Sequence, residues 1–306
     1  MANSESWPDH ESMELLRHLA IRTPRAAPAP LAAGRRSKEL GMSLEMADFR
    51  AYTQGDDPRH LDWGQLAKFD QLVIRLFYAQ RAARVAIVLD CSASMDFGVP
   101  RKFDFGRMLA ACLGIITLNG SNELTLLPTG DTAADYYRRA VSTCVGIASA
   151  EILRRLRSLR ARGVADWSAL ARHMAVRRST LLIVISDCLP PGDSNALVQA
   201  FAVRGTQLVV LHTLSPQELQ PDFTGSPTLR EPESGRLRRI SGVVAARSHY
   251  QSNLTRWRAM LRNKVQRCDG IYIDICTSEN MMVVLTRRLR HILEGNAAWP
   301  GSLRNN

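Results

Sequence analysis

The chain has 306 residues, of which 45% are hydrophobic and 23% are charged. This composition is typical of a globular protein with a substantial buried core, and it excludes a chain that is disordered throughout. Lysine and arginine number 40 against 29 aspartate and glutamate residues, which gives a formal net charge of +11. A basic chain of this kind could contact an acidic protein, a nucleic acid or an anionic membrane surface.

Three further features of the sequence bear on its cellular compartment. No apolar run approaches the roughly 18 residues that a transmembrane helix requires. The N-terminal segment MANSESWPDHESMELL lacks a basic start followed by an apolar stretch, so we expect no secretory signal. The six cysteines are scattered, without a CxxC pair and mostly within apolar runs, which indicates reduced thiols in the cytoplasm and neither a disulfide framework nor a zinc site.

The first 83 residues are predicted to form two parts. Residues 1–35 combine a weak helix over about Glu11–Ile21 with a Pro/Ala-rich segment, and we expect them to be a flexible tail. Residues 36–83 mix glycine, acidic and aromatic residues and are predicted to be an N-terminal extension packed on the domain that follows. This extension includes a turn at Gly55–Pro58 and a strand over Leu72–Tyr78.

From residue 84 onward, predicted strands alternate with predicted helices. Continuous apolar runs, typical of strands buried on both faces, occur at Val85–Leu89, Leu181–Ile185 and Leu208–Leu211. Further strands are predicted at Leu124–Leu127, Asp135–Tyr137 and Ile271–Ile275, and helices at Phe105–Ile116, Ala150–Arg160, Trp167–Val176, Ser194–Val203, Leu254–Val265 and Met281–Leu293.

This alternation predicts an α/β fold, with a doubly wound and mostly parallel sheet that has helices on both faces. The predicted domain covers residues 84–296. It contains a loop and helix insertion at about 216–267, of which 216–243 is Pro/Gly-rich and polar and is expected to be loop or a small hairpin. Residues 297–306 are expected to be a C-terminal tail.

Two of the predicted strands end in carboxylates. Asp90 follows the first apolar run and begins a DxSxS pattern with Ser92 and Ser94, and Asp187 follows the second run. In an open α/β sheet, ligands bind outside the carboxyl ends of the strands, near the point where the strand order reverses. Carboxylate and hydroxyl oxygens suit Mg²⁺ or another divalent cation. These four residues are therefore a predicted metal site, and helix capping or turn formation is the alternative role.

Longer motifs give these residues a context. The loop DCSASM at 90–95 resembles the metal-ion-dependent adhesion site of von Willebrand factor A-type domains. The upstream segment FRAYTQGDDPRHLDW at 49–63, together with FGVPRKF at 97–103, EPESGRLRR at 231–239 and GIYID at 270–274, resembles the family called "domain of unknown function 58". The resemblance covers roughly residues 36–294.

This resemblance implies a von Willebrand A-like fold and a non-enzymatic adaptor, in which a partner's carboxylate completes the metal shell of the adhesion site. It also implies a MoxR-type AAA+ ATPase as the partner, the pair acting as a chaperone in complex assembly or in metal-centre activation of a client protein. The family usually has a threonine metal ligand in a turn that corresponds here to Gly163–Asp166, where Ala165 occupies the threonine position. Asp166 and Ser168 are the candidate replacements, so the predicted site is degenerate.

The acidic turn within the extension has two interpretations. Asp56, Asp57, Arg59 and Asp62 are close in sequence and could form a partner-docking surface or reach toward the metal loop. Alternatively, Arg59 pairs with Asp62 or Asp57 while Trp63 packs into the core, which would fix the segment onto the sheet.

Basic residues are concentrated in two segments. Residues 154–178 hold eight arginines against a single acid, and residues 230–267 hold ten basic residues against two acids. Each segment could be a solvated face, a surface for an acidic protein partner or a nucleic-acid contact.

Signatures of catalysis are missing from the sequence. The patterns GxxxxGK[ST], HExxH and GxSxG do not occur, which favours a protein that is not an enzyme and hydrolyses no ATP itself. Cys91 and Cys188 lie beside the aspartates and are interpreted as small apolar fillers. The alternative functions are a metal-dependent hydrolase or phosphotransferase that uses Asp90 and Asp187, and a nucleic-acid-binding factor.

Overall fold

The computed structural model describes residues 10–21, 46–54, 61–77, 83–129, 137–139, 145–168, 170, 179–189, 206–222, 228–232, 235–239 and 243–295. The chain forms two compact units, one made of Met1–Thr23 with Ala83–Asn306 and the other of Pro24–Ala82. None of the described helices is long and apolar enough to cross a membrane.

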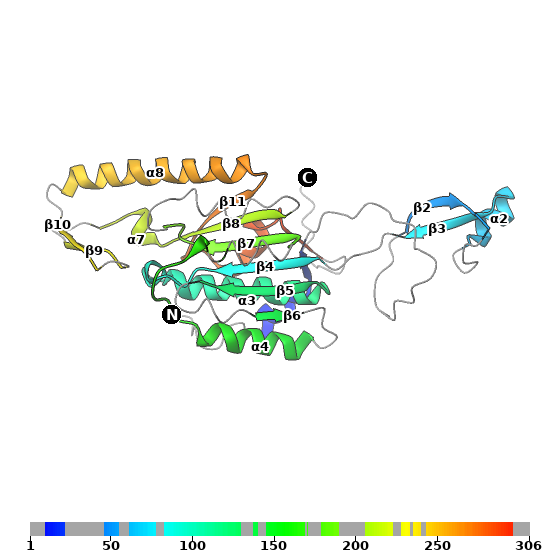
Figure 1. The fold of residues 1–306 in the computed structure, drawn as a ribbon, viewed down its shortest axis with the longest axis horizontal. Helices are drawn as coiled ribbons and strands as arrows, with labels where there is room; N and C mark the ends of the chain where they lie inside the picture. The colour runs from blue at the N-terminus through cyan, green and yellow to red at the C-terminus, as the bar shows by residue number, and fades with distance from the viewer. Residues whose placement is uncertain are drawn as a thin grey trace. The chain divides into compact units, whose positions relative to one another are not determined.

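The larger unit is built around a six-stranded sheet (Figure 1). Its strands are β4 (Arg84–Leu89), β5 (Glu123–Pro128), β6 (Tyr137–Arg139), β7 (Leu181–Ser186), β8 (Gln207–Leu214) and β11 (Ile271–Cys276). Their order across the sheet is β11-β8-β7-β4-β5-β6, and five of them are parallel while β6 is an antiparallel edge strand. The predicted α/β fold with a mostly parallel sheet is therefore confirmed.

The strand order reverses at the centre of this sheet. From β4 the chain proceeds outward through β5 to β6, and from β7 it proceeds the other way through β8 to β11. The two central strands pair in parallel, with Leu89 opposite Ile185 at their carboxyl ends. The residues that follow β4 and β7 thus lie at the switch point where α/β proteins bind ligands.

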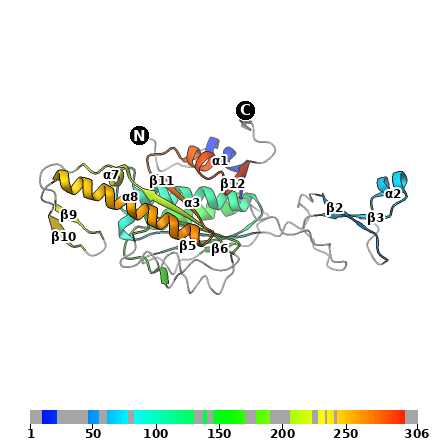
Figure 2. The same ribbon diagram turned by 90° about the horizontal axis from the view of Figure 1, so that it is seen from above.

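Each face of the sheet contributes to its own core, because successive side chains of a strand point to opposite faces. In β4, Val85, Ile87 and Leu89 join the core under α3 (Lys102–Asn119) and α4 (Val145–Ser158). Ala86 and Val88 join the core on the other face, where α8 (Val243–Arg267) packs through its C-terminal half. Figure 2 shows α3 and α8 on opposite sides of the sheet.

The N-terminal segment belongs to the larger unit, and the expected flexible tail is wrong for residues 10–21. Helix α1 (His10–Arg17) is followed by β1 (Leu19–Ile21), which pairs antiparallel with β12 (Leu293–Gly295). The side chain of Leu16 is fully buried in the core beside α3. Residues 19–21 are extended where a helix is predicted, because pairing with the far end of the chain overrides the local periodicity.

The C-terminal helix is also shorter than predicted. Helix α9 covers Met281–Val283 and continues as a single π-helical turn, η4 (Val284–Arg288), before the chain reaches β12. The predicted helix over Met281–Leu293 is therefore wrong at its end, where Leu293 joins a strand.

The insertion contains the predicted small hairpin, together with an additional short helix and a longer second helix than the sequence predicts. It begins with the short helix α7 (Pro216–Leu219), continues with the antiparallel hairpin of β9 (Thr228–Arg230) and β10 (Leu237–Arg239), and ends with the 25-residue helix α8. The predicted helix at Ser194–Val203, the turn at Gly55–Pro58 and most of Trp167–Val176 lie outside the described residues.

The smaller unit contains β2 (Met46–Ala51) and β3 (Val73–Phe77), which pair antiparallel, and the helix α2 (Trp63–Phe69) between them. The strand predicted at Leu72–Tyr78 corresponds to β3.

Candidate functional site

The structure brings the two predicted strand-end carboxylates to the same edge of the sheet. Asp90 follows β4 and Asp187 follows β7, and the Asp90 amide donates a hydrogen bond of 2.9 Å to the Ile185 carbonyl of the neighbouring strand. Both carboxylates are buried, as are the side chains of Ser92 and Ser94. Four residues predicted for one site thus lie at the switch point of the sheet.

The Asp90 carboxylate is fixed by three hydrogen bonds. Its Oδ1 accepts from the Ser92 amide at 2.9 Å and from Thr129 Oγ1 at 3.1 Å, and its Oδ2 accepts from Ser186 Oγ at 2.5 Å. Burial raises the pKa of Asp90, and the nearby charge of Asp187 raises it further. Asp90 therefore organises the loop, and its carboxylate is a weaker acid than an exposed aspartate.

The two serines of the DxSxS pattern face each other. Ser92 Oγ lies 3.0 Å from Ser94 Oγ, and Ser94 belongs to the short 3₁₀ turn η2 (Ala93–Met95). The contact joins Ser92, which precedes the turn in an extended conformation, to the second residue of the turn.

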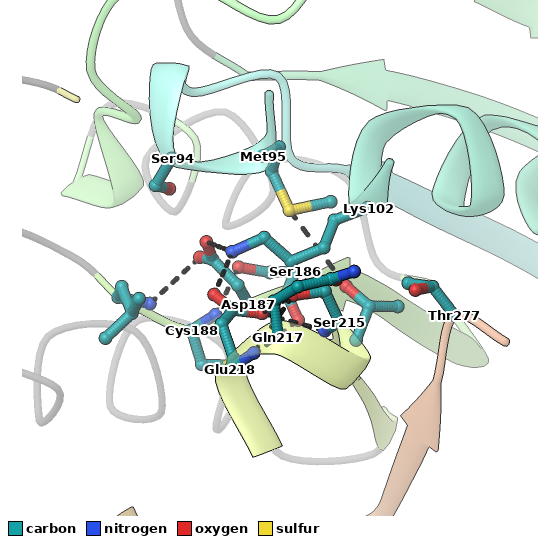
Figure 3. Close-up of polar contacts among 12 residues, drawn as sticks. Ser94, Met95, Lys102, Ser186, Asp187, Cys188, Ser215, Gln217, Glu218 and Thr277 are labelled. Atoms are coloured by element: carbon teal, nitrogen blue, oxygen red, sulfur yellow. Dashed lines mark hydrogen bonds and ion pairs between the residues drawn. The ribbon is translucent and has the colours of Figure 1, made fainter. Parts of the chain in front are cut away.

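Lys102 is the member of the site that sequence reasoning missed. Its Nζ lies 2.7 Å from Asp187 Oδ2 and 2.5 Å from Glu218 Oε1, although the lysine side chain is only 1% exposed (Figure 3). Burial lowers the pKa of Lys102, but the charges of Asp187 and Glu218 outweigh this effect and raise the pKa above its ordinary value. A buried ammonium ion therefore bridges two carboxylates at the switch point.

Glu218 reaches the site from the surface helix α7. Its Oε2 accepts hydrogen bonds from the Ser215 amide at 2.8 Å and from Ser215 Oγ at 3.0 Å, while the Ser215 hydroxyl caps the helix by accepting from the Glu218 amide. This is a capping box in which the glutamate closes the helix N-terminus with one oxygen and binds Lys102 with the other.

The turn at 163–166, where the family resemblance implies a threonine ligand, lies next to the Asp90 loop. The Arg162 amide donates to the Cys91 carbonyl at 2.8 Å, and the Gly163 carbonyl accepts from the Ala93 amide at 2.9 Å. Ala165 is buried in the core beneath α8 and supplies no oxygen, whereas Asp166 is exposed. The candidate replacement Asp166 is therefore not part of the buried cluster.

A divalent cation fits these residues poorly. Asp187, which the metal would need, is already bound to the Lys102 ammonium, and a second cation beside Lys102 would be repelled. The family resemblance implies a threonine ligand at position 165, where this chain has alanine and offers only a methyl group. Within the described residues, no three His, Cys, Asp or Glu side chains converge to hold a metal ion.

A rim of exposed apolar side chains accompanies the buried charges. Phe97, Val99, Val164 and Leu189 are all exposed and belong to the loops described above. The Phe97 ring centroid lies 5.8 Å from the Lys102 ammonium, and the Leu189 amide donates to Asp187 Oδ1 at 3.2 Å. The charged centre therefore lies among loops that present apolar side chains to solvent.

The acidic turn of the smaller unit is described only in part. Asp56, Asp57 and Arg59 lie outside the described residues. Asp62 caps α2, because its Oδ1 accepts from the amides of Gly64 at 2.9 Å and Gln65 at 3.2 Å. Within the smaller unit Trp63 is 65% exposed. The interpretation in which Trp63 packs into the core stays a prediction. A docking role for Asp56, Asp57, Arg59 and Asp62 stays a prediction.

The cysteines beside the aspartates are buried. Burial raises the pKa of the Cys188 thiol well above its ordinary value, and the charge of Asp187 raises it further. Cys91 is also buried, and its thiol donates to the Leu89 carbonyl at 3.5 Å. Cys188 is therefore a poor nucleophile at neutral pH, because the thiolate is the reactive form.

Part of the basic surface is neutralised within the chain. Arg258 and Arg262 of α8 both pair with Asp274 of β11, and Arg154 and Arg155 both pair with Glu151. Each acid accepts two arginines, so both segments keep an excess of positive charge.

Fold and site together define an α/β protein with a buried charged cluster at the switch point of its sheet. The profile of the family "Protein of unknown function DUF58" matches residues 48–260, and the chain belongs to this family. An uncharacterized protein of Mycobacterium tuberculosis and one of Mycobacterium bovis are each 25% identical to the chain over 254 residues, covering 81% of this chain and 79% of theirs.

Solved structures with a similar arrangement are more distant. The conserved hypothetical protein BatB from Bacteroides thetaiotaomicron aligns with a TM-score of 0.40 and 13% identity, covering 69% of this chain and 98% of that one. An aerotolerance-related membrane protein from Bacteroides fragilis aligns with a TM-score of 0.43 and 16% identity, covering 68% of this chain and 98% of its own.

Proposed function

We propose that the chain is a non-enzymatic, von Willebrand A-like adaptor that binds a protein partner at the edge of the sheet formed by the loops after β4 and β7. The observation that carries this proposal is the buried cluster of Asp90, Asp187 and Lys102 at the switch point, accompanied by exposed apolar side chains. The strand order, the antiparallel edge strand β6 and the DxSxS loop support the von Willebrand A-like assignment.

The composition of this edge suits a protein partner. Protein interfaces concentrate their binding energy in a few apolar or aromatic anchors around which water is excluded. We assign this anchoring role to Phe97, Val99, Val164 and Leu189, which are exposed apolar side chains in three different loops. The nearby charges would then select the partner through a complementary side chain.

The same geometry argues against the hydrolase alternative. A metal-dependent hydrolase or phosphotransferase would need Asp90 and Asp187 free to bind a metal or to accept a proton. Asp90 accepts three hydrogen bonds, and Asp187 is bound to the Lys102 ammonium and to the Leu189 amide. A protein that binds a partner without catalysing a reaction can keep all of these hydrogen bonds intact.

We take the partner to be a MoxR-type AAA+ ATPase, which the family resemblance implies, with ATP hydrolysis belonging to the ATPase. The test is the affinity of the purified chain for the MoxR-type ATPase of the same organism. Phe97→Ser and Leu189→Ser should each weaken binding by about tenfold or more, because they remove exposed anchors. Leu237→Ser is the matched control, since Leu237 is also an exposed apolar residue but lies on β10.

The control should bind as the unmodified chain does. Equal affinity of the Phe97→Ser, Leu189→Ser and control variants would overturn the proposal that this edge is the binding surface. A loss of affinity in Leu237→Ser alone would instead place the binding surface on the hairpin of β9 and β10.

A further inference from the structure

We propose that Lys102 is the cation of this site: a partner's carboxylate binds directly to the Lys102 ammonium, without a divalent metal, and Glu218 occupies that position until the partner displaces it. This inference rests on the proposed function, because it names the side chain that the adaptor recognises and the group that blocks the site beforehand. The recognised group is the carboxylate of an aspartate, a glutamate or a chain terminus.

The first argument is the place of the ammonium. Lys102 begins α3 and extends its side chain to the switch point, where it contacts Asp187 of the loop after β7. A metal adhesion site needs a cation at this position to link the protein's own carboxylate to the carboxylate of its ligand. Lys102 makes this link, with Asp187 on one side and Glu218 on the other.

The second argument is that only one of the two carboxylates is exchangeable. Asp187 is completely buried and its second oxygen accepts from the Leu189 amide, so it belongs to the framework of the site. The Glu218 side chain is 13% exposed and stands on a four-residue helix that has no buried residue. Rotation of this side chain alone would vacate the Lys102 ammonium.

The third argument is the set of donors around Glu218. One carboxylate oxygen is bound by Lys102 Nζ, and the other is bound by the Ser215 amide and the Ser215 hydroxyl. These donors form a cradle for both oxygens of a carboxylate. If Glu218 turned outward, the same three donors would be left to bind a carboxylate from another chain with charge-assisted hydrogen bonds.

The fourth argument concerns the attachment of α7. Gln217 exchanges two hydrogen bonds with the backbone of Val99, at 3.1 Å and 3.3 Å, and both are exposed to solvent. Exposed hydrogen bonds of this kind contribute little net stability. Val99 also belongs to the proposed binding edge, so a partner that contacts this residue would act directly on the helix that carries Glu218.

The test is chemical rescue by a small carboxylate. Glu218→Ala should lower the melting temperature by about 5 °C, because it leaves the buried ammonium undercompensated. Sodium acetate at about 100 mM, roughly a hundredfold above the Kd of a site of millimolar affinity, should restore most of this loss. Sodium chloride at equal ionic strength should not restore it, and neither salt should rescue Glu218→Ala in a chain that also carries Lys102→Met.

Gln217→Ala is the matched control, since it alters the neighbouring exposed residue of α7 and leaves the cradle intact. Its melting temperature should not respond to acetate. If Glu218→Ala does not fold, Glu218→Gln retains the shape of the side chain, and acetate should then compete with the amide and raise the melting temperature. The absence of an acetate effect in the variant that folds would overturn the proposal.

A titration with magnesium chloride at about 5 mM tests the competing assignment, because an ion that binds only the folded chain raises its melting temperature. A chelator-reversible rise in the melting temperature of the unmodified chain would overturn the assignment of Lys102, because a metal would then be the cation. If acetate rescues Glu218→Ala while Phe97→Ser leaves the affinity for the ATPase unchanged, the result supports carboxylate binding by Lys102 and contradicts the proposed function. The two failures are therefore distinguishable.

Discussion

The Lys102 ammonium lies 2.7 Å from Asp187 Oδ2, and the two residues are 85 positions apart in the sequence. This ion pair joins the first turn of α3 to the loop after β7. It therefore connects two elements that are far apart in the sequence. The solvent has almost no access to either side chain. A buried pair of this kind contributes little net stability compared with apolar packing, but removal of one partner is costly.

Lys102→Met tests the role of the buried ammonium in the fold. The substitution leaves the carboxylates of Asp187 and Glu218 facing each other without a cation, and we expect the free energy of unfolding to fall by about 3–5 kcal/mol. Urea denaturation followed by tryptophan fluorescence measures the change.

The double variant Lys102→Met with Asp187→Asn is the control for this prediction. It removes both charges of the pair, so it should be more stable than Lys102→Met alone. A single variant that loses less than about 1 kcal/mol would contradict the buried pair, since such a loss is ordinary for a surface substitution.

His212 predicts how stability depends on pH. Its Nδ1 lies 2.5 Å from the Tyr272 hydroxyl, its ring meets Trp257 edge-on, and its Nε2 makes no hydrogen bond among the described residues. Burial lowers the pKa of His212 from 6.5 to about 4, and the charge of Arg258 also lowers it against the opposing effects of Asp187 and Asp274. The folded chain therefore keeps this imidazole neutral.

The sign of the effect follows from the two protonation states. Between pH 6.5 and about 4 the unfolded chain binds a proton at His212 that the folded chain does not, so stability falls as the pH falls through this window. The loss from this one group approaches about 3 kcal/mol. In urea titrations at pH 7 and pH 4.5, His212→Asn should lose about 2 kcal/mol less than the unmodified chain does.

His249→Asn is the matched control, because His249 lies on α8 and is exposed. It should lose as much stability on acidification as the unmodified chain. Equal acid sensitivity of the His212 and His249 variants would show that His212 is not buried in its neutral form.

The sequence predicts the central sheet well for a physical reason. The strands that contain Val85–Leu89 and Leu181–Ile185 are buried on both faces, so they appear in the sequence as continuous apolar runs. Leu19–Ile21 carries no such signal, because three residues are too few to show a period. Its extended structure depends on pairing with Leu293–Gly295, which no local window includes.

The site could be predicted only in part. Asp90 and Asp187 were expected at one edge because parallel strands end there together, and the structure places them there. Lys102 and Glu218 were not predicted to belong to the site. A lysine in the first turn of a helix is normally solvated, and Glu218 lies in a polar segment. One signal was available: Lys102 opens a helix that is apolar on nearly all sides, and a charge on such a helix must be buried with a partner.

Leu16→Ala tests whether the N-terminal segment is part of the larger unit. Leu16 is fully buried in the main core, so its truncation should lower the free energy of unfolding by about 2–5 kcal/mol. Arg17→Ala is the control, because Arg17 is exposed and its pair with Glu14 contributes no more than about 0.5 kcal/mol. If both variants unfold at the same urea concentration as the unmodified chain, residues 10–21 do not pack in solution as described.

Gly98→Ala tests the attachment of α7 without altering any charge. Gly98 has a φ of +93°, and a Cβ added there would lie 2.3 Å from Ser215 Cβ. Only glycine allows the loop after β4 to approach the start of α7 so closely. The alanine variant should therefore displace the helix and strain the loop, at a cost of about 1–3 kcal/mol.

Amide hydrogen exchange reports this displacement directly. The amides of Glu218 and Leu219 bond to the Ser215 carbonyl, and in Gly98→Ala they should exchange about tenfold faster or more. Gly146→Ala is the matched control, since an added Cβ there meets nothing within 4 Å and alanine favours the helix α4. Unchanged exchange in α7 of the Gly98 variant would mean that Ser215 and the loop after β4 are not in contact, and the cradle around Glu218 would then lack the support described for it.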